Sequence, residues 1–209
     1  PELENLRAQG IYKFRHPKSH IAFQEQIESP DTVPFATPSG KIEIFSPRLW
    51  AMGNHREIPA TPQYIPAWEG PQDVLIAKYP LQCIGPHSKR RAHSTFDNSP
   101  WLEEANPQQM SMNPSDAKVR GIQNGDLARV FNDRGELIIT VKVTSRILPG
   151  VIAIPQGAWW EPDRNGIDRR GSINVLTNHR PTPLAKANPQ HTILVEVERI
   201  GERRSHGSV

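Results

Sequence analysis

The amino-acid sequence predicts a mainly β fold with short helices, in which short strands close into a barrel. Its 21 prolines among 209 residues and its mean hydropathy of -0.59 argue against a helical bundle, because proline interrupts helix interiors. Short apolar runs bounded by Gly and Pro are typical of strands. The length suits one good core with appended segments.

Residues 1–72 are predicted to form a proline-rich, loop-rich segment leading from a preceding domain. Prolines recur from Pro30 to Pro71, so only short elements fit there. One exception is residues 40–46, where polar and apolar side chains alternate as in a half-buried strand.

A compact domain is predicted over residues 73–200, followed by a polar tail at 201–209 that we expect to be disordered. Residues 73–76 and 80–84 are apolar enough for core strands. A Gly-containing connection between residues 127–131 and 136–143 predicts a hairpin. Further strands are expected at residues 151–154, 172–176 and 192–198, a set suited to a closed barrel.

Two short helices are predicted between these strands. One covers residues 101–105. The other begins after Asn113, which can cap it, with Pro114 at the first helical position and Asp116 in the first turn, and it ends at Gly121.

The single cysteine, Cys83, lies in an apolar run and is predicted to be a buried strand thiol. One cysteine excludes an intramolecular disulfide and a multi-cysteine metal site within this chain. No apolar stretch approaches the roughly 20 residues that a membrane span requires. His87 and His93 lack a third ligand at a suitable spacing, so no metal site is expected.

The loop at residues 86–95 is the first candidate for binding chemistry. It gathers hydroxyl groups, cations and imidazoles directly after a predicted core strand. Such a group can neutralise and hydrogen-bond a pyrophosphate. The alternative is a solvated basic loop, and the net charge of +3 with a pI near 9.2 does not choose between a phosphate ligand and nucleic acid.

Asn113 and Asp116 form the second candidate site. The Asp116 carboxylate could accept two parallel hydrogen bonds from a guanine edge, with Asn113 contacting the same base or its ribose. The alternative is that both residues only cap the helix.

Three further positions could contact a ligand. Gly157 would allow close approach to the backbone, beside the adjacent Trp159 and Trp160. Asn174 could match the amide face of a pterin. Residues 186–191, which include Asn188, form a polar loop that either closes over a ligand or only connects two elements.

The order of these segments resembles the C-terminal domain of the dimethyl sulfoxide reductase family of molybdenum oxidoreductases, especially catalytic subunits of the anaerobic enzymes and their paralogues. Each matching segment is short, but their shared order covers most of the chain. The segments are FATPSGKIE (35–43), HSKRRAHST (87–95), NPSDA (113–117), RGIQNGD (120–126), NDRG (132–135), PGV (149–151), GAW (157–159), NVLT (174–177) and ANPQH (187–191).

The resemblance implies a double-psi β-barrel over about residues 73–200 and a bis(molybdopterin guanine dinucleotide) molybdenum cofactor. By position, it assigns phosphate and pterin contacts to the first loop and guanine contacts to the helix start. The first set is His87, Arg91, His93, Ser94 and Thr95, the second is Asn113 and Asp116, and the remaining wall is Gly157, Trp159, Asn174 and Asn188.

The resemblance also implies what this chain lacks. The family's iron-sulfur cysteines and its molybdenum ligand have no counterpart here, so we assign no catalytic residue and expect the chain to be inactive alone. The whole enzyme would reduce S-oxides or N-oxides, or selenate, by oxygen-atom transfer in anaerobic respiration. Its expected partners are the rest of its catalytic subunit, an iron-sulfur electron-transfer subunit and a membrane anchor, at the periplasmic face of the bacterial inner membrane.

Two competing hypotheses come from the residues themselves. A basic β-barrel module for nucleic acid or another anion would rest on Lys89, Arg90 and Arg91, the pI and five tryptophans. However, the aromatic side chains are not interleaved with basic ones along one strand face. A purely structural domain that contacts another subunit is compatible with cofactor binding.

Overall fold

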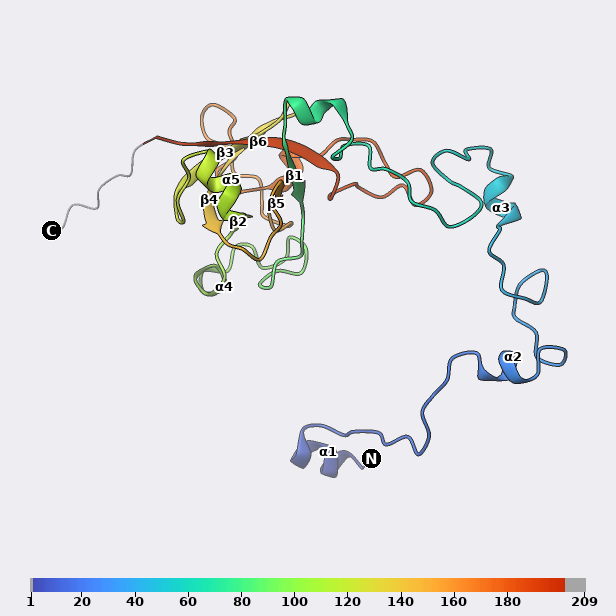
Figure 1. Ribbon diagram of the computed structural model, residues 1–209. Helices are drawn as coiled ribbons and strands as arrows, with labels where there is room; N and C mark the ends of the chain where they lie inside the picture. Colours follow the sequence, from blue (N-terminus) through green and yellow to red (C-terminus); the bar gives the residue numbers. More distant parts are fainter. Residues whose placement is uncertain (1, 202–209) are drawn as a thin grey trace. The chain divides into compact units, whose positions relative to one another are not determined.

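Six strands form a closed barrel in the computed structural model, which describes residues 2–201 (Figure 1). Around the barrel the order is β1, β5, β2, β4, β3 and β6. The predicted mainly β fold and the closed barrel are confirmed. The strands are β1 Leu81–Ile84, β2 Gln109–Met112, β3 Leu127–Phe131, β4 Glu136–Val143, β5 Val151–Ala153 and β6 Ile193–Arg199.

The strand directions decide which loops lie at the same end of the barrel. β1 and β5 are parallel neighbours, so the chain leaves both strands at one end. β2 runs antiparallel to β5, and the chain therefore leaves β2 at the opposite end. This topology places the loops at residues 86–97 and 155–161 together and separates both from Asn113.

The core lies inside the barrel and is formed by alternate strand residues. Met110 and Met112 of β2 are fully buried, as are Ala128 and Val130 of β3. Cys83 of β1 is also fully buried, as predicted, and burial raises the pKa of its thiol to about 12. Each large apolar side chain buried in this way contributes about 1.5–3 kcal/mol to folding.

The two predicted helices are confirmed. α4 covers Pro100–Ala105 and α5 covers Pro114–Val119, each with proline in its first turn. The Asn113 side chain caps α5 by accepting a hydrogen bond from the Ser115 backbone N–H at 2.9 Å.

Three predicted strands are corrected. Residues 73–76 fall instead at the 3-10 helix η1 (Val74–Ala77), because the Asp73 carboxylate accepts a hydrogen bond from the Leu75 N–H at 2.8 Å and caps it. Residues 172–176 fall at the 3-10 helix η2 (Ile173–Leu176), where buried Asp168 accepts hydrogen bonds from the Gly171 and Ser172 N–H groups. Residues 40–46 pair with no strand in the described chain.

Strand β2 was not predicted. Only Met110 and Met112 alternate with polar neighbours in it, which is too short a pattern to identify a strand. The strand forms because both of its edges are paired, with β4 on one side and β5 on the other.

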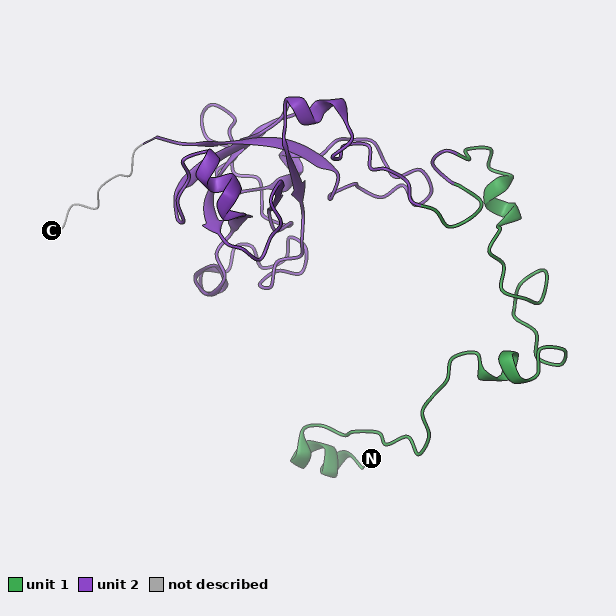
Figure 2. Cartoon of the chain, in the orientation of Figure 1, with its two compact units in different colours: residues 1–55, 59–63 green, residues 56–58, 64–209 purple. Residues whose placement is uncertain are grey.

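The described chain divides into two units, drawn in green and purple in Figure 2. One contains the residues up to 55 together with 59–63, and the other contains 56–58 and the chain from residue 64 onward. The first unit holds α1 (Leu3–Gln9), α2 (Gln24–Glu28) and α3 (Pro47–Trp50), none of which has a buried residue. This unit lies within the segment predicted to be loop-rich, residues 1–72.

The domain boundaries predicted after residues 72 and 200 stay predictions, and the predicted tail lies outside the described residues apart from Gly201. Among residues 2–201, no helix has both the length and the apolar character needed to cross a membrane.

Candidate functional site

The loop after β1 presents four of the predicted ligand-binding side chains to solvent. His87, His93, Ser94 and Thr95 are all exposed. The loop turns sharply here: the Thr95 N–H donates to the Ala92 carbonyl at 3.0 Å, and His93 has a left-handed backbone with φ 55°. The His87 and His93 rings meet edge to face, with centroids 5.1 Å apart.

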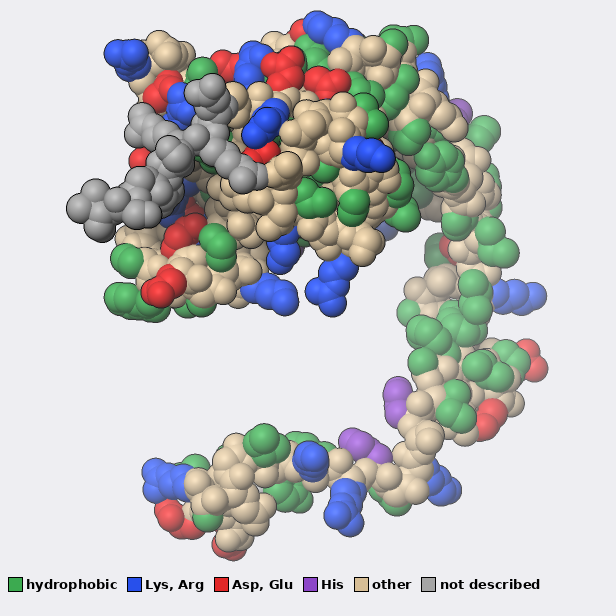
Figure 3. All heavy atoms as spheres, turned by 60° about the vertical axis from the view of Figure 1, so that its left-hand side comes forward, with side chains coloured by type: hydrophobic (Ala, Val, Ile, Leu, Met, Phe, Trp, Pro, Cys, Tyr) green, Lys and Arg blue, Asp and Glu red, His purple; other side chains and the backbone are tan. Residues whose placement is uncertain are grey.

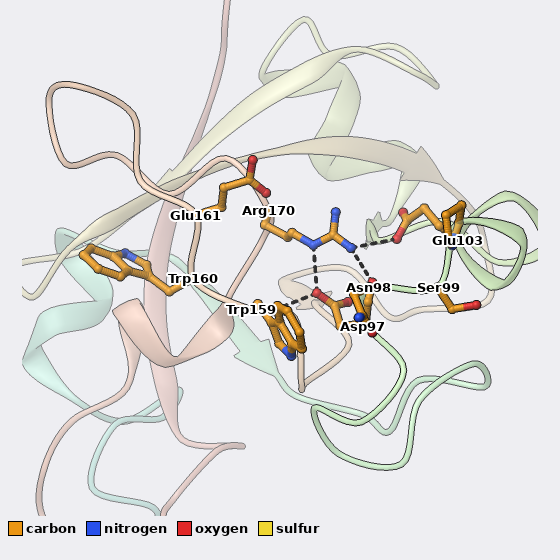
Figure 4. Close-up of a pocket in the computed structure, with 9 residues that line it drawn as sticks. Asp97, Asn98, Ser99, Glu103, Trp159, Trp160, Glu161 and Arg170 are labelled. Carbon is orange, nitrogen blue, oxygen red and sulfur yellow. Dashed lines mark hydrogen bonds and ion pairs between the residues drawn. The ribbon is translucent and has the colours of Figure 1, made fainter.

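Next to this exposed face lies a group of buried and partly buried charges, which we call the Asp97 cluster. Its side chains are Arg90, Arg91, Asp97, Glu103 and Arg170. One Asp97 carboxylate oxygen accepts hydrogen bonds from Arg91 at 2.7 Å and Arg90 at 3.0 Å, and the other accepts from Arg170 at 2.7 Å. Figure 4 shows Arg170 extending between Asp97 and Glu103.

The Asp97 cluster has one more positive than negative charge, because three guanidinium groups face two carboxylates. Burial by itself raises the pKa of Asp97, but hydrogen bonds from Arg170, the Trp159 backbone N–H and Arg91 outweigh it and hold that pKa below its usual range. Within residues 2–201 the Nε groups of Arg90 and Arg91 are buried without a hydrogen-bond partner. Counting these five side chains, the Asp97 cluster has a net charge of +1, and the Glu161 carboxylate also acts on Arg170 from nearby.

Arg91 lies within this cluster and not on the exposed face. Its side chain has no exposed surface, and it donates to Gln108 at 2.6 Å and to the Gln156 carbonyl at 3.1 Å. A direct contact between Arg91 and a bound phosphate, as predicted, would require the loop to move. In the observed arrangement, Arg91 joins the loop after β1 to the loop after β5.

The loop after β5 packs directly on the loop after β1. Trp159 donates from its indole nitrogen to the Ser94 carbonyl at 2.8 Å, and Gln156 bonds His87 at 3.0 Å. Gly157 has φ 91°, and a Cβ at this position would lie 1.8 Å from the His93 carbonyl oxygen. The predicted close approach to Gly157 is thus made by the protein's own backbone.

Asn113 and Asp116 lie at the opposite end of β2. Asn113 caps α5 and donates to the Ile147 carbonyl at 2.7 Å, and one Asp116 oxygen accepts from the Gly150 N–H at 2.8 Å. Asn113 therefore caps the helix, whereas Asp116 fixes the turn before β5 and does not cap, and the predicted guanine contacts of both residues stay predictions. Five strand steps from Gln108 to Asn113 separate the two ends by about 16 Å.

Three neighbouring cavities bring the remaining predicted residues together. The Arg170 cavity, about 520 Å³, is lined by Trp159, Trp160 and Arg170 among others. The Asn174 cavity, about 560 Å³, shares Trp160 with it. The Asn188 cavity, about 310 Å³, shares residues 177–179 with the Asn174 cavity. Trp159, Asn174 and Asn188 therefore line successive parts of one row of cavities.

The wall of the Asn174 cavity is held by a partly buried ion pair. Arg134 forms two hydrogen bonds to the Glu69 carboxylate, at 2.7 and 2.9 Å, and donates to the Leu176 carbonyl at 2.8 Å. A Cβ on Gly135 would lie 2.8 Å from the Val175 carbonyl oxygen, so the hairpin turn packs tightly on this segment.

Sequence reasoning missed Asp97, Gln108 and Arg170. Gln108 accepts from Arg91 and donates to the Pro155 and Gly171 carbonyls at 2.8 and 3.0 Å, so it joins three segments. No local motif marks these residues. The sequence offered one weak signal, a carboxylate at Asp97 shortly after the adjacent Arg90 and Arg91.

No group of three or more potential metal ligands of the His, Cys, Asp and Glu types occurs among the described residues. The polar groups that line the row of cavities are of the kinds that bind phosphates and planar polar rings: the His179 imidazole, several amides and hydroxyls, and the partly exposed guanidinium groups of Arg134 and Arg170.

Comparisons with known proteins agree on one family. Residues 81–194 match the family model described as Molydopterin dinucleotide binding domain. The chain is 49% identical to dimethyl sulfoxide reductase DmsA of Haemophilus influenzae, in an alignment that covers 96% of this chain. It is 38% identical to trimethylamine-N-oxide reductase 1 of Escherichia coli, in an alignment that covers 90% of this chain. It spans only 26% and 23% of those relatives, about a quarter of their length.

A solved structure supports the fold. Acetylene hydratase from Pelobacter acetylenicus superposes with a TM-score of 0.67 at 22% identity, over 82% of this chain and 25% of that one. With the closed barrel, this similarity supports the expected double-psi topology and says nothing about the reaction.

Proposed function

Because this chain belongs to the Molydopterin dinucleotide binding domain family, we propose that it holds the guanine dinucleotide form of the molybdopterin cofactor in an oxidoreductase acting on S-oxides or N-oxides. The observation that carries this proposal is the row of cavities beside an exposed loop of imidazoles and hydroxyls, supported by a buried cluster with excess positive charge.

The residues present fit such a ligand. A dinucleotide carries two negative phosphates and two planar polar ring systems, so it needs hydrogen-bond donors in a positive field and polar groups at ring edges. His87, His93, Ser94 and Thr95 are exposed donors next to the guanidinium groups of the Asp97 cluster. In this proposal they bind the diphosphate directly, whereas Arg91 positions their loop from below and adds its charge.

The guanine end is proposed to lie at the start of α5. One Asp116 oxygen is bonded to the Gly150 N–H, which leaves the half-exposed carboxylate with further acceptor capacity for a base edge. Only an extended ligand could contact this end and the loop after β1, because about 16 Å separates Gln108 and Asn113, the residues that flank β2. A dinucleotide has the required length.

The activity of the whole enzyme is part of the proposal. When bound, a molybdenum bis(molybdopterin guanine dinucleotide) cofactor supplies oxygen-atom transfer chemistry. The similarity to dimethyl sulfoxide and trimethylamine N-oxide reductases supports an S-oxide or N-oxide substrate, with selenate as a further candidate.

The assembly around this chain is proposed from the same relatives. Its partners would be the rest of its catalytic subunit, which would carry the iron-sulfur cluster, an iron-sulfur electron-transfer subunit and a membrane anchor. We place the enzyme in anaerobic respiration at the periplasmic face of the inner membrane.

A nucleic-acid-binding role has less support. Nucleic-acid-binding surfaces concentrate Lys and Arg on one face, whereas on the face seen in Figure 3 basic and acidic side chains are interspersed over the barrel unit. Of the three basic residues on which that hypothesis partly rested, Arg90 and Arg91 are buried in the Asp97 cluster and only Lys89 is exposed.

The guanine end can be tested by following the backbone amide chemical shifts of the chain during separate titrations with GDP and ADP. GDP should shift residues 87–95 and 113–116, and ADP should shift only the first set. Asp116→Asn should weaken GDP binding and leave ADP unchanged, because an amide cannot accept two hydrogen bonds from the guanine edge. Asp126→Asn, which alters a carboxylate that also accepts from a backbone N–H, is the control. Equal responses to GDP and ADP would reject guanine recognition.

A further inference from the structure

The Asn174 cavity contains three ring-binding groups that make no internal hydrogen bonds through their side chains. The Trp160 side chain is 62% exposed and lines both this cavity and the Arg170 cavity. The Asn174 amide and the His179 imidazole are exposed at the same cavity, and in residues 2–201 neither has a hydrogen-bond partner. An indole face, an amide and an imidazole are thus available to one ligand.

The backbone that carries Asn174 is fixed even though its side chain is free. The Thr177 side chain and N–H both donate to the Asn174 carbonyl, at 3.0 and 3.3 Å. The next turn is held by Arg134, through its bonds to Glu69 and to the Leu176 carbonyl. Little conformational entropy would therefore be lost when the Asn174 amide binds a ligand.

We infer that Trp160 is the stacking platform for a flat fused-ring heterocycle in the Asn174 cavity, with Asn174 and His179 hydrogen-bonding the edge of the ring. An exposed indole has a large flat face, and a planar heteroaromatic ring covers it with favourable offset stacking. The cavity volume, about 560 Å³, lies in the range of small-molecule sites. The inference rests on the proposed function, because the pterin of the proposed cofactor is such a ring.

Trp101 provides a matched control. It is 74% exposed on α4, so it is as accessible as Trp160, but it lines none of the three cavities. Both side chains are exposed, so replacing either one with alanine should leave the fold intact, which a thermal melt checks.

The test follows the indole N–H resonances of the whole chain during separate titrations with 6-hydroxymethylpterin and GDP. The pterin should shift the Trp160 resonance and leave the Trp101 resonance in place. Trp160→Ala should weaken pterin binding by about tenfold and Trp160→Phe by less, since a phenyl ring still stacks. Trp101→Ala should bind like the original chain, and Asn174→Ala and His179→Ala should each weaken binding further when combined with Trp160→Phe.

Two outcomes would overturn the inference and are distinguishable. If GDP shifts residues 87–95 while the pterin leaves Trp160 unmoved, stacking is rejected and the proposed dinucleotide site stands. If neither ligand shifts any of these residues, both the stacking platform and the dinucleotide site are rejected for this chain.

Discussion

The two ends of β2 use polar side chains in different ways. At the Gln108 end, the charges of the Asp97 cluster pair with one another, and the exposed side chains of His93, Ser94 and Thr95 form no hydrogen bonds among the described residues, whereas His87 is bonded to Gln156. At the Asn113 end, the candidate ligand groups themselves hold the structure, with Asn113 capping α5 and Asp116 fixing Gly150. The candidate ligand groups and the supporting groups are therefore mostly separate residues at one end and the same residues at the other.

Breaking the Asp97 cluster should have the largest effect. Asp97→Asn removes the charge that three guanidinium groups share, and loss of one partner from a buried ion pair typically costs about 3–5 kcal/mol. Urea unfolding would measure the loss in free energy of unfolding. A loss below about 1 kcal/mol would show that the cluster does not support the exposed loop.

Disrupting the packing between the loop after β1 and the loop after β5 should have the next largest effect on the free energy of unfolding. Gly157→Ala would place a methyl group in the space of the His93 carbonyl and force a left-handed backbone on alanine, so we expect a loss of about 3 kcal/mol or more. Gly125→Ala is the control, because Gly125 has a similar φ of 89° and a methyl group there would meet nothing within 4 Å, so it should cost about 1 kcal/mol. Equal losses would contradict the loop packing.

At the other end of β2 the effect should be smaller. Asn113→Ala removes a helix cap and a bond to the Ile147 carbonyl, which together should cost about 1–2 kcal/mol. Amide shifts at residues 87–95 should not change. A response there would show that the two ends are coupled, contrary to the separation described above.

Acid should destabilise the chain through the Asp97 cluster, at the Gln108 end of β2. The folded-state pKa of Asp97 lies below its ordinary value, so its contribution is fully present above about pH 4 and is lost as the pH falls through the folded pKa. Asp133, bonded to Lys78, and Asp163, bonded to Arg169, add to this loss. Urea midpoints at pH 5 and pH 3 should differ less in Asp97→Asn than in the original chain, and an equal difference would exclude Asp97 as a source.

Local signals in the sequence predicted the local structure. The apolar run before Gly85, the hairpin around residues 132–135 and the Asn113 cap each depend on neighbouring residues, and each was confirmed. Residues 73–76 and 172–176 were predicted wrongly, because an apolar run of about four residues does not distinguish a strand from a single turn that a nearby carboxylate caps.

Contacts between distant residues could not be predicted in this way. Asp97 bonds Arg170 across 73 positions, and the need for glycine at 157 comes from the His93 carbonyl. For the same reason, the sequence indicated that the loop at residues 86–95 is cationic and did not show that Arg90 and Arg91 are buried beneath its histidines.

The central claim, that this chain binds a dinucleotide along β2 with the diphosphate at one end and guanine at the other, is tested most directly by offering the two halves of GDP separately. Amide shifts of the whole chain would be mapped with pyrophosphate alone and with guanosine alone. We predict that pyrophosphate shifts residues 87–95 and guanosine shifts residues 113–116. Overlapping responses at one end, or pyrophosphate shifts scattered over exposed lysines, would contradict the account.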